Sequence, residues 1–196
     1  MTSHGPTRDE LRVLVVCTAN VSRSPLGAAF LSKRLADAGV VASIRSAGVM
    51  RTRLPVDELS VLVGRARGVD ITEHRPRRLT TAILAQEGAD LVITMTRAHV
   101  REVVALDSSA WERTFTLKEL ARLVRTERLA EVGDAGSWVA RFGVGRTVQD
   151  LLGADERDDI GDPYGGSLVV HRDIATEIDD LLAEVVDGFL RFIATP

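Results

Sequence analysis

Residues 13–25 read VLVVCTANVSRSP and combine the end of a buried strand, a short loop and the start of a helix. The apolar run ends at Cys17, the single cysteine of the chain, and Arg23 follows after five intervening residues. Ser24 is predicted to cap the helix, because Pro25 suits its first position. A helix N-terminus after such a loop favours a bound anion and a cysteine thiolate. The stretch therefore predicts a phosphate-binding loop with a nucleophile at its entrance, whereas Cys17 alone would be typical of a buried structural cysteine.

The rest of the chain alternates predicted strands with predicted helices, which is typical of a parallel sheet. Strands are predicted over residues 11–17, 40–46, 89–95 and 114–117. Helices are predicted over residues 26–38, 56–67, 98–106, 118–129, 139–152 and 172–193. We expect a single-domain, three-layer αβα fold of the α/β class. Its four-stranded parallel sheet would carry helices on both faces and the phosphate-binding loop after the first strand. Ligands of such sheets bind beyond the carboxyl ends of the strands, where the loop would lie.

Composition narrows the class of protein. The 196 residues fit one domain, predicted over residues 11–196, after a flexible tail at residues 1–10 and with an insert around residues 125–160. The net charge of −3 argues against general binding of nucleic acids, and no apolar run is long enough to span a membrane. The N-terminus has no apolar signal segment, so we expect a cytoplasmic protein, by default a monomer. One cysteine excludes an internal disulfide and a four-cysteine zinc site.

A thiolate that attacks a phosphate ester needs a partner acid to protonate the leaving oxygen. Asp162 is the leading candidate, in the segment Asp-Pro-Tyr that precedes the last predicted helix. Asp-Pro followed by two glycines is also typical of an ordinary turn. Asp158 and Asp159 lie nearby and compete for the role, but no proline restrains them.

Together these residues resemble the low-molecular-weight protein tyrosine phosphatase family. The hallmarks of that family are V-C-x5-R-S-P after the first strand and D-P-Y before the last helix, and both occur here in that order. The resemblance covers roughly residues 11–120 and 160–193. It implies a protein tyrosine phosphatase that works through a phosphocysteine intermediate without metal or cofactor. The implied partner is a phosphotyrosine-bearing protein, and a bacterial tyrosine kinase is one candidate.

The resemblance also implies roles for individual residues. Cys17 would be the nucleophile, Arg23 would bind the phosphoryl oxygens, and Asp162 would protonate the leaving group and then activate water. Tyr164 would form one wall of the cleft, and Ser24 would donate a hydrogen bond to the thiolate. The other substrate-binding loop residues would be Thr18, Ala19, Asn20, Val21 and Ser22.

A further set would hold the loop in shape: Asn20, Ser24, Ser46 and His74. For His74, an ordinary exposed loop residue is an equally good interpretation. We expect the other histidines, His4, His99 and His171, on the surface.

The chain departs from the family at several positions. Ala19 replaces a common glycine, which would cost about 1 kcal/mol if that position needed a positive φ. Ser22 replaces a frequent second cysteine. Met50 and Gly165 stand where aromatic residues are common, so the cleft is expected to be less aromatic.

Three alternative functions stay open at this point. An arsenate reductase of this fold would need an external thiol, because the chain has no second cysteine. A phosphoarginine phosphatase belongs to the same family, but that branch carries threonine where this chain has Val21. An inactive phosphoprotein-binding module would need Arg23 but neither Cys17 nor Asp162, so the presence of all three argues against it.

Overall fold

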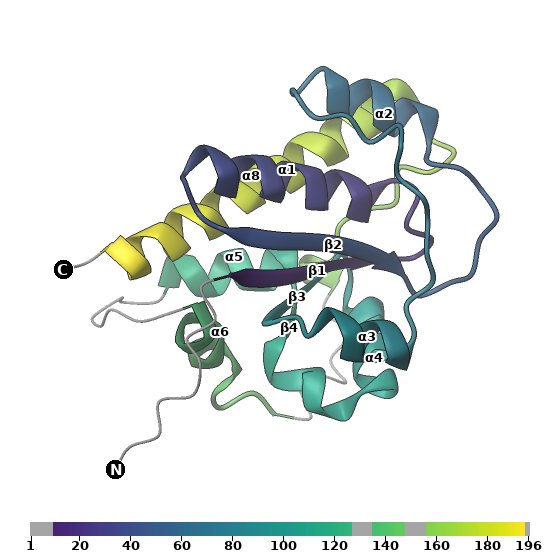
Figure 1. The fold of residues 1–196 in the computed structure, drawn as a ribbon. Coiled ribbons are helices and arrows are strands. Elements are labelled where there is room, and N and C mark those ends of the chain that lie inside the picture. Colours follow the sequence, from purple (N-terminus) through teal and green to yellow (C-terminus); the bar gives the residue numbers. More distant parts are fainter. Residues whose placement is uncertain (1–9, 127–134, 148–155, 195–196) are drawn as a thin grey trace, which may run out of the picture.

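The computed structural model describes residues 10–126, 135–147 and 156–194. Its sheet has four parallel strands in the order β2-β1-β3-β4 (Figure 1). The strands are β1 (Leu11–Cys17), β2 (Ala42–Gly48), β3 (Leu91–Thr94) and β4 (Thr114–Thr116). This topology confirms the predicted α/β class and the four-stranded parallel sheet.

Helices cover both faces of the sheet (Figure 1). The helices are α1 (Arg23–Asp37), α2 (Glu58–Arg65), α3 (Thr81–Glu87), α4 (Arg97–Leu106), α5 (Leu117–Thr126), α6 (Ala135–Gly143) and α8 (Leu168–Ala194), with short 3₁₀ turns η1 (Ser108–Arg113) and η2 (Glu156–Asp158). In Figure 1, α1, α2 and α8 lie above the sheet, and α3 and α4 lie below it. The long helix α8 packs against α1, α2 and α5 and so ties one layer together.

Strand β1 divides the core into two parts because its side chains alternate between the faces. Val13 and Val15 belong to the larger cluster, which includes side chains of α1, α5 and α8. Leu14 and Val16 belong to the smaller cluster with residues of α3, α4 and η1. All four valine and leucine side chains are buried, so β1 is fixed on both faces and places Cys17 rigidly at its carboxyl end.

Several predicted boundaries were wrong. Helix α1 begins at Arg23 with Ser22 at its N-cap position, so the predicted cap at Ser24 is incorrect. The second strand is shifted two residues towards the C-terminus, and α8 begins four residues before the predicted start at residue 172. Helix α3 was not predicted, because its seven residues are too few to establish an apolar period.

The predicted insert is partly described. Helix α6 occupies its middle and ends at Gly143, whereas the prediction placed a helix over residues 139–152, part of which lies outside the described residues. Trp138 of α6 is 1% exposed and packs edge-on against Phe142 and Phe189. The predicted tail lies outside the described residues except for residue 10. Within the described ranges, no helix combines the length and apolarity needed to cross a bilayer.

Candidate active site

A cavity of about 210 Å³ opens at the carboxyl end of β1. Three segments line it: the phosphate loop (residues 17–23), the segment 50–54 that follows β2, and the pair Asp162 and Tyr164 before α8. These segments come together because the parallel strands β1 and β2 end at the same edge of the sheet. A wider groove of about 730 Å³ lies behind the loop, but none of residues 17–23 lines it. The candidate site residues Cys17 and Arg23 therefore belong to the smaller cavity.

Cys17 lies at the base of this cavity and is 3% exposed. Its Sγ lies 2.9 Å from Ser24 Oγ, and the backbone N–H of Asn20 donates to the same sulfur at 3.3 Å. The Ser24 hydroxyl belongs to the first turn of α1, and the Asn20 N–H belongs to the loop before it. Two hydrogen-bonding groups around one sulfur suit a cysteine nucleophile, because a nucleophilic sulfur needs its neighbours to hold it in place.

Asn20 holds the loop together from behind the cavity. Its side chain is fully buried, and its Nδ2 donates to the hydroxyls of Ser24 and Ser46 at 2.9 Å each. Its Oδ1 accepts from the backbone N–H of Arg77 at 3.0 Å and lies 3.1 Å from His74 Nε2. Asn20 is also the one non-glycine residue with a positive φ, 59°, in the part of the chain that the structure describes. The strained loop position is therefore Asn20, not Ala19, and the suggested cost at Ala19 does not arise.

His74 is half-buried and its Nε2 lies 3.0 Å from the backbone carbonyl of Asn20. Burial is the largest cause that lowers the pKa of His74 below 6.5, and the nearby guanidinium groups of Arg77 and Arg75 lower it further. A neutral imidazole at this position suits a hydrogen bond to the loop backbone. The structure thus favours a loop-holding position for His74 over an exposed loop residue.

Arg23 joins the phosphate loop to the acid segment. Its side chain is 4% exposed, with Nη1 donating to the carbonyl of Ile160 at 2.9 Å and Nη2 donating to Thr18 Oγ1 at 3.0 Å. Nη2 also pairs with Asp162 Oδ2, and the Asp162 side chain is 47% exposed. Two neutral oxygens therefore fix the orientation of the guanidinium. Its carboxylate partner is the exposed one, so an incoming phosphate could replace that carboxylate without disturbing the two neutral contacts.

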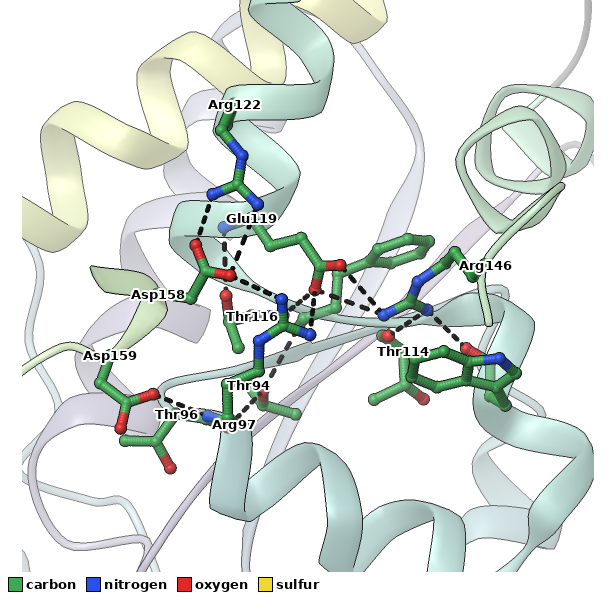
Figure 2. Close-up of polar contacts among 12 residues, drawn as sticks. Thr94, Thr96, Arg97, Thr114, Thr116, Glu119, Arg122, Arg146, Asp158 and Asp159 are labelled. Atoms are coloured by element: carbon green, nitrogen blue, oxygen red, sulfur yellow. Dashed lines mark hydrogen bonds and ion pairs between the residues drawn. The ribbon is translucent and has the colours of Figure 1, made fainter. Parts of the chain in front are cut away.

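A buried ion network fixes the segment that leads to Asp162 (Figure 2). Asp158 is 1% exposed and pairs with Arg97 at 2.7 Å and with Arg122. Asp159 Oδ1 accepts from the backbone N–H of Arg97 at 2.7 Å. Both carboxylates, the competitors for the acid role, are thus engaged away from the cavity, and neither lines it. Among the described lining residues, Asp162 is therefore the carboxylate of the cavity that also contains Cys17.

The same network continues to the sheet. Glu119 of α5 is 5% exposed and pairs with Arg97 at 3.7 Å and with Arg146 at 3.2 Å (Figure 2). The Arg146 guanidinium lies over the Trp111 and Phe115 rings, 3.7 and 4.3 Å from their centroids. The Ile160 N–H also donates to the carbonyl of Met95, the residue that follows β3. The acid segment is therefore anchored to the sheet a few residues before Asp162.

A second buried chain links α8 to the phosphate loop. His171 is 1% exposed, so its predicted surface position is wrong, and its Nε2 lies 2.9 Å from Asp57 Oδ1. Asp57 caps α2 by accepting from Ser60 N–H, and Ser60 Oγ donates to Ser22 Oγ at 2.7 Å. Helix α8 begins just after Asp162 and Tyr164. These contacts therefore connect the phosphate loop to the segment that carries both residues.

The cavity walls combine aliphatic, polar and charged side chains. Tyr164 is 52% exposed, and Met50 and Leu54, which line the same cavity, are 58% and 45% exposed. Val21 lines the interior and is 4% exposed. Thr18, Ala19 and Ser22 line the cavity too, whereas Asn20, Ser24, Ser46 and His74 lie behind it and contact the loop.

Sequence reasoning missed two residues of the site. His99 was predicted on the surface but is 4% exposed, and its Nε2 lies 3.1 Å from Thr18 Oγ1. The signal was present, because His99 and the buried Val103 are four residues apart on one face of α4. Gly48 ends β2 against the loop, where a Cβ would lie 2.7 Å from the backbone carbon of Ala19. The glycine permits that close approach.

Comparisons with known proteins agree with this geometry. The family model described as low molecular weight phosphotyrosine protein phosphatase matches residues 12–134. The probable low molecular weight protein-tyrosine-phosphatase EpsP of Ralstonia solanacearum is 36% identical over 109 residues, which cover 55% of this chain and 71% of that protein. A protein-arginine-phosphatase of Geobacillus stearothermophilus is 28% identical over 179 residues, or 90% of this chain and 94% of that protein.

The fold is also found among solved structures. The crystal structure of the low molecular weight protein tyrosine phosphatase from T. tengcongensis superposes with a TM-score of 0.66 at 28% identity, covering 90% of this chain and 98% of that one. The family model spans more than half of the sequence, and it includes the loop with Cys17 and Arg23. The chain therefore belongs to the low molecular weight phosphotyrosine protein phosphatase family.

Proposed function

We propose that this protein hydrolyses phosphotyrosine on proteins through a phosphocysteine intermediate at Cys17. The observation that carries the proposal is the convergence of three groups on one small cavity: the Cys17 sulfur, the Arg23 guanidinium and the Asp162 carboxyl. A nucleophile, a planar phosphate clamp and an exposed acid are what phosphoryl transfer to a thiolate requires.

In the first step the Cys17 thiolate attacks phosphorus, and the bond from phosphorus to the tyrosine oxygen breaks. Asp162, protonated, gives its proton to the departing phenolate. In the second step Asp162, now a carboxylate, takes a proton from water as the water oxygen attacks the phosphocysteine. The P–S bond breaks, inorganic phosphate leaves, and the Cys17 thiolate is restored with Asp162 protonated again.

Arg23 and the loop amides stabilise the transferring group. The three equatorial oxygens of the transferring group carry negative charge. Their hydrogen-bond donors would be the loop backbone N–H groups and the two Nη atoms of Arg23. Phosphate binding would take Nη2 from Asp162, which frees that carboxyl at the rim for the leaving oxygen. The bonds from Arg23 to Ile160 and Thr18 keep the guanidinium plane in place through this exchange.

Phosphotyrosine fits the walls better than phosphoarginine. Met50, Leu54 and Tyr164 offer apolar surface for a neutral phenyl ring. The guanidinium of phosphoarginine would need acidic neighbours, but Asp162 is the one carboxylate among the described lining residues, against Arg23 and Arg51. The β-branched apolar Val21 points to the same choice.

Phosphoarginine is the second candidate, because the protein-arginine-phosphatase relative aligns with 90% of the chain, well beyond the N-terminal motif. Arsenate reduction is a third outcome that needs an external small thiol. A cytoplasmic location belongs to the proposal, since the nucleophile must stay reduced and reducing compartments keep thiols free.

The test is steady-state hydrolysis of a phosphotyrosine peptide by the wild type, Cys17→Ser and Asp162→Asn, without added metal. We expect Cys17→Ser to abolish activity and Asp162→Asn to lower kcat by a factor of about 10²–10⁴. A matched peptide with phosphoarginine should be cleaved with a lower kcat/KM. A wild type that is inert on phosphotyrosine but cleaves phosphoarginine or reduces arsenate would overturn the proposal.

A further inference from the structure

His99 is a buried histidine that the two-step reaction does not use. It lies in the first turn of α4, three residues after Thr96, whose side chain accepts from the His99 backbone N–H. Its ring is placed against the phosphate loop, with Nε2 3.1 Å from Thr18 Oγ1. The other ring nitrogen, Nδ1, is buried with no hydrogen-bond partner among the described residues. The Thr18 hydroxyl is therefore the polar group to which this ring is directed.

Thr18 connects His99 to the phosphate clamp. It follows the nucleophile directly and lines the cavity, and its Oγ1 accepts from Arg23 Nη2 at 3.0 Å. Arginine only donates, so the single Thr18 proton and the second lone pair of Oγ1 stay available for the imidazole. His99 thus fixes the rotation of a hydroxyl that fixes one Nη of Arg23.

The ring is neutral where the enzyme would work. Burial is the main cause that lowers the pKa of His99 from 6.5 to about 4, and the positive charge of Arg23 adds to it. A neutral ring places no second cation beside Arg23. It therefore leaves the positive charge of Arg23 free for the phosphoryl oxygens and for Asp162.

We propose that His99 is a positioning residue, which holds the Thr18 hydroxyl and through it orients the Arg23 guanidinium towards the phosphoryl group. The proposal rests on the proposed phosphatase function. Its physical basis is the exchange at Nη2. When phosphate replaces Asp162, the hydrogen bonds to Ile160 and Thr18 are what keep the guanidinium plane fixed. A loose Thr18 would remove one of these two restraints.

The test compares His99→Leu with His99→Gln on a phosphotyrosine peptide. Leucine fills similar volume without a polar atom, whereas the glutamine amide reaches the position of Nε2 and restores a hydrogen bond. We expect His99→Leu to lower kcat about tenfold, as the loss of roughly one hydrogen bond from the transition state, with KM changed less than about twofold. His99→Gln should recover kcat to within about threefold. Glu102→Gln, an exposed change on the same helix, should match the wild type.

Thr18 supplies the second arm, which also serves if His99→Leu does not fold. Thr18→Val should lower kcat as His99→Leu does, Thr18→Ser should retain it, and the double variant Thr18→Val/His99→Leu should be no slower than Thr18→Val alone. Equal kcat for His99→Leu and wild type, equal losses for leucine and glutamine, or additive effects in the double variant would each overturn the proposal. An inert wild type would instead refute the phosphatase function itself.

Discussion

Asn20 is the residue on which the shape of the phosphate loop depends most, and two substitutions separate its contributions. Asn20→Gly removes the side chain but tolerates the positive φ of 59°, whereas Asn20→Ala removes the side chain and strains the backbone. The amide makes four hydrogen-bond contacts, with Ser24, Ser46, the Arg77 backbone and His74. At about 1 kcal/mol each, their loss lowers the free energy of unfolding by about 3–4 kcal/mol in Asn20→Gly.

Alanine should be worse than glycine at this position. The left-handed conformation costs a non-glycine residue about 1–2 kcal/mol. Alanine also has less conformational entropy than glycine in the unfolded chain, which offsets part of that cost. The net expectation is a further loss of about 0.5–1 kcal/mol in Asn20→Ala. Urea unfolding with an unchanged m-value measures both differences. Asn20→Gly within 1 kcal/mol of the wild type would refute the hydrogen-bond argument, and Asn20→Ala more stable than Asn20→Gly would refute the backbone argument.

Three other perturbations test separate parts of the structure. Gly48→Ala would place a Cβ 2.7 Å from the loop backbone. We expect kcat/KM to fall at least tenfold and the free energy of unfolding to fall by about 1–3 kcal/mol, and wild-type kinetics would contradict this. Burial and Arg23 lower the pKa of His99 to about 4, so the unfolded chain binds a proton there between pH 6.5 and 4 while the native chain does not. Stability should therefore fall by about 3 kcal/mol as the pH drops through that window, and urea unfolding of His99→Gln should lack this part of the decline. Asp158→Asn should lower the free energy of unfolding by about 3 kcal/mol, because two arginines lose a buried partner. Asp159→Asn should lower it by less than about 1 kcal/mol. Equal effects of the two substitutions would refute the buried network.

The first strand and its loop were predictable because their signals are local. An unbroken apolar run ending at Cys17 indicates a strand buried on both faces, and the structure has β1 over the predicted residues 11–17. The alternation of strands and helices was likewise sufficient for the parallel sheet. Asp162 was singled out through its motif, and the structure pairs it with Arg23, while its role as an acid stays a prediction.

The errors at individual residues come from side-chain contacts that the local sequence pattern does not reveal. Serine favours helix caps, but Ser24 lies inside α1 with its hydroxyl 2.9 Å from the Cys17 sulfur, and Ser22 occupies the N-cap position. His99 and His171 were predicted on the surface because no motif includes them. The period of α4 did place His99 on the face of the buried Val103, and the His171 ring lies 3.0 Å from the carbonyl of Ser167, four residues earlier. The groups that they meet, Thr18 and Asp57, belong to other elements of the fold. Propensity cannot register such partners.

Helix α3 was missed for a different reason. Seven residues give less than two full apolar periods, but capping signals flank them. The Thr80 side chain accepts from Ile83 N–H at the start, and Gly88 adopts a left-handed conformation with φ 51° at the end. Capping residues would therefore have located this helix where periodicity could not.

The central claim is that Cys17 carries the phosphoryl group, and the most direct measurement is the mass of the acid-quenched protein. Asp162→Asn should slow hydrolysis of the intermediate, so mixing it with a phosphotyrosine peptide should add the mass of one phosphoryl group to the protein. We expect peptide mapping to place that group on Cys17, and Cys17→Ala to show no addition under the same conditions. A phosphoryl group on another residue, or turnover of the peptide by Cys17→Ala at the wild-type rate, would contradict the account.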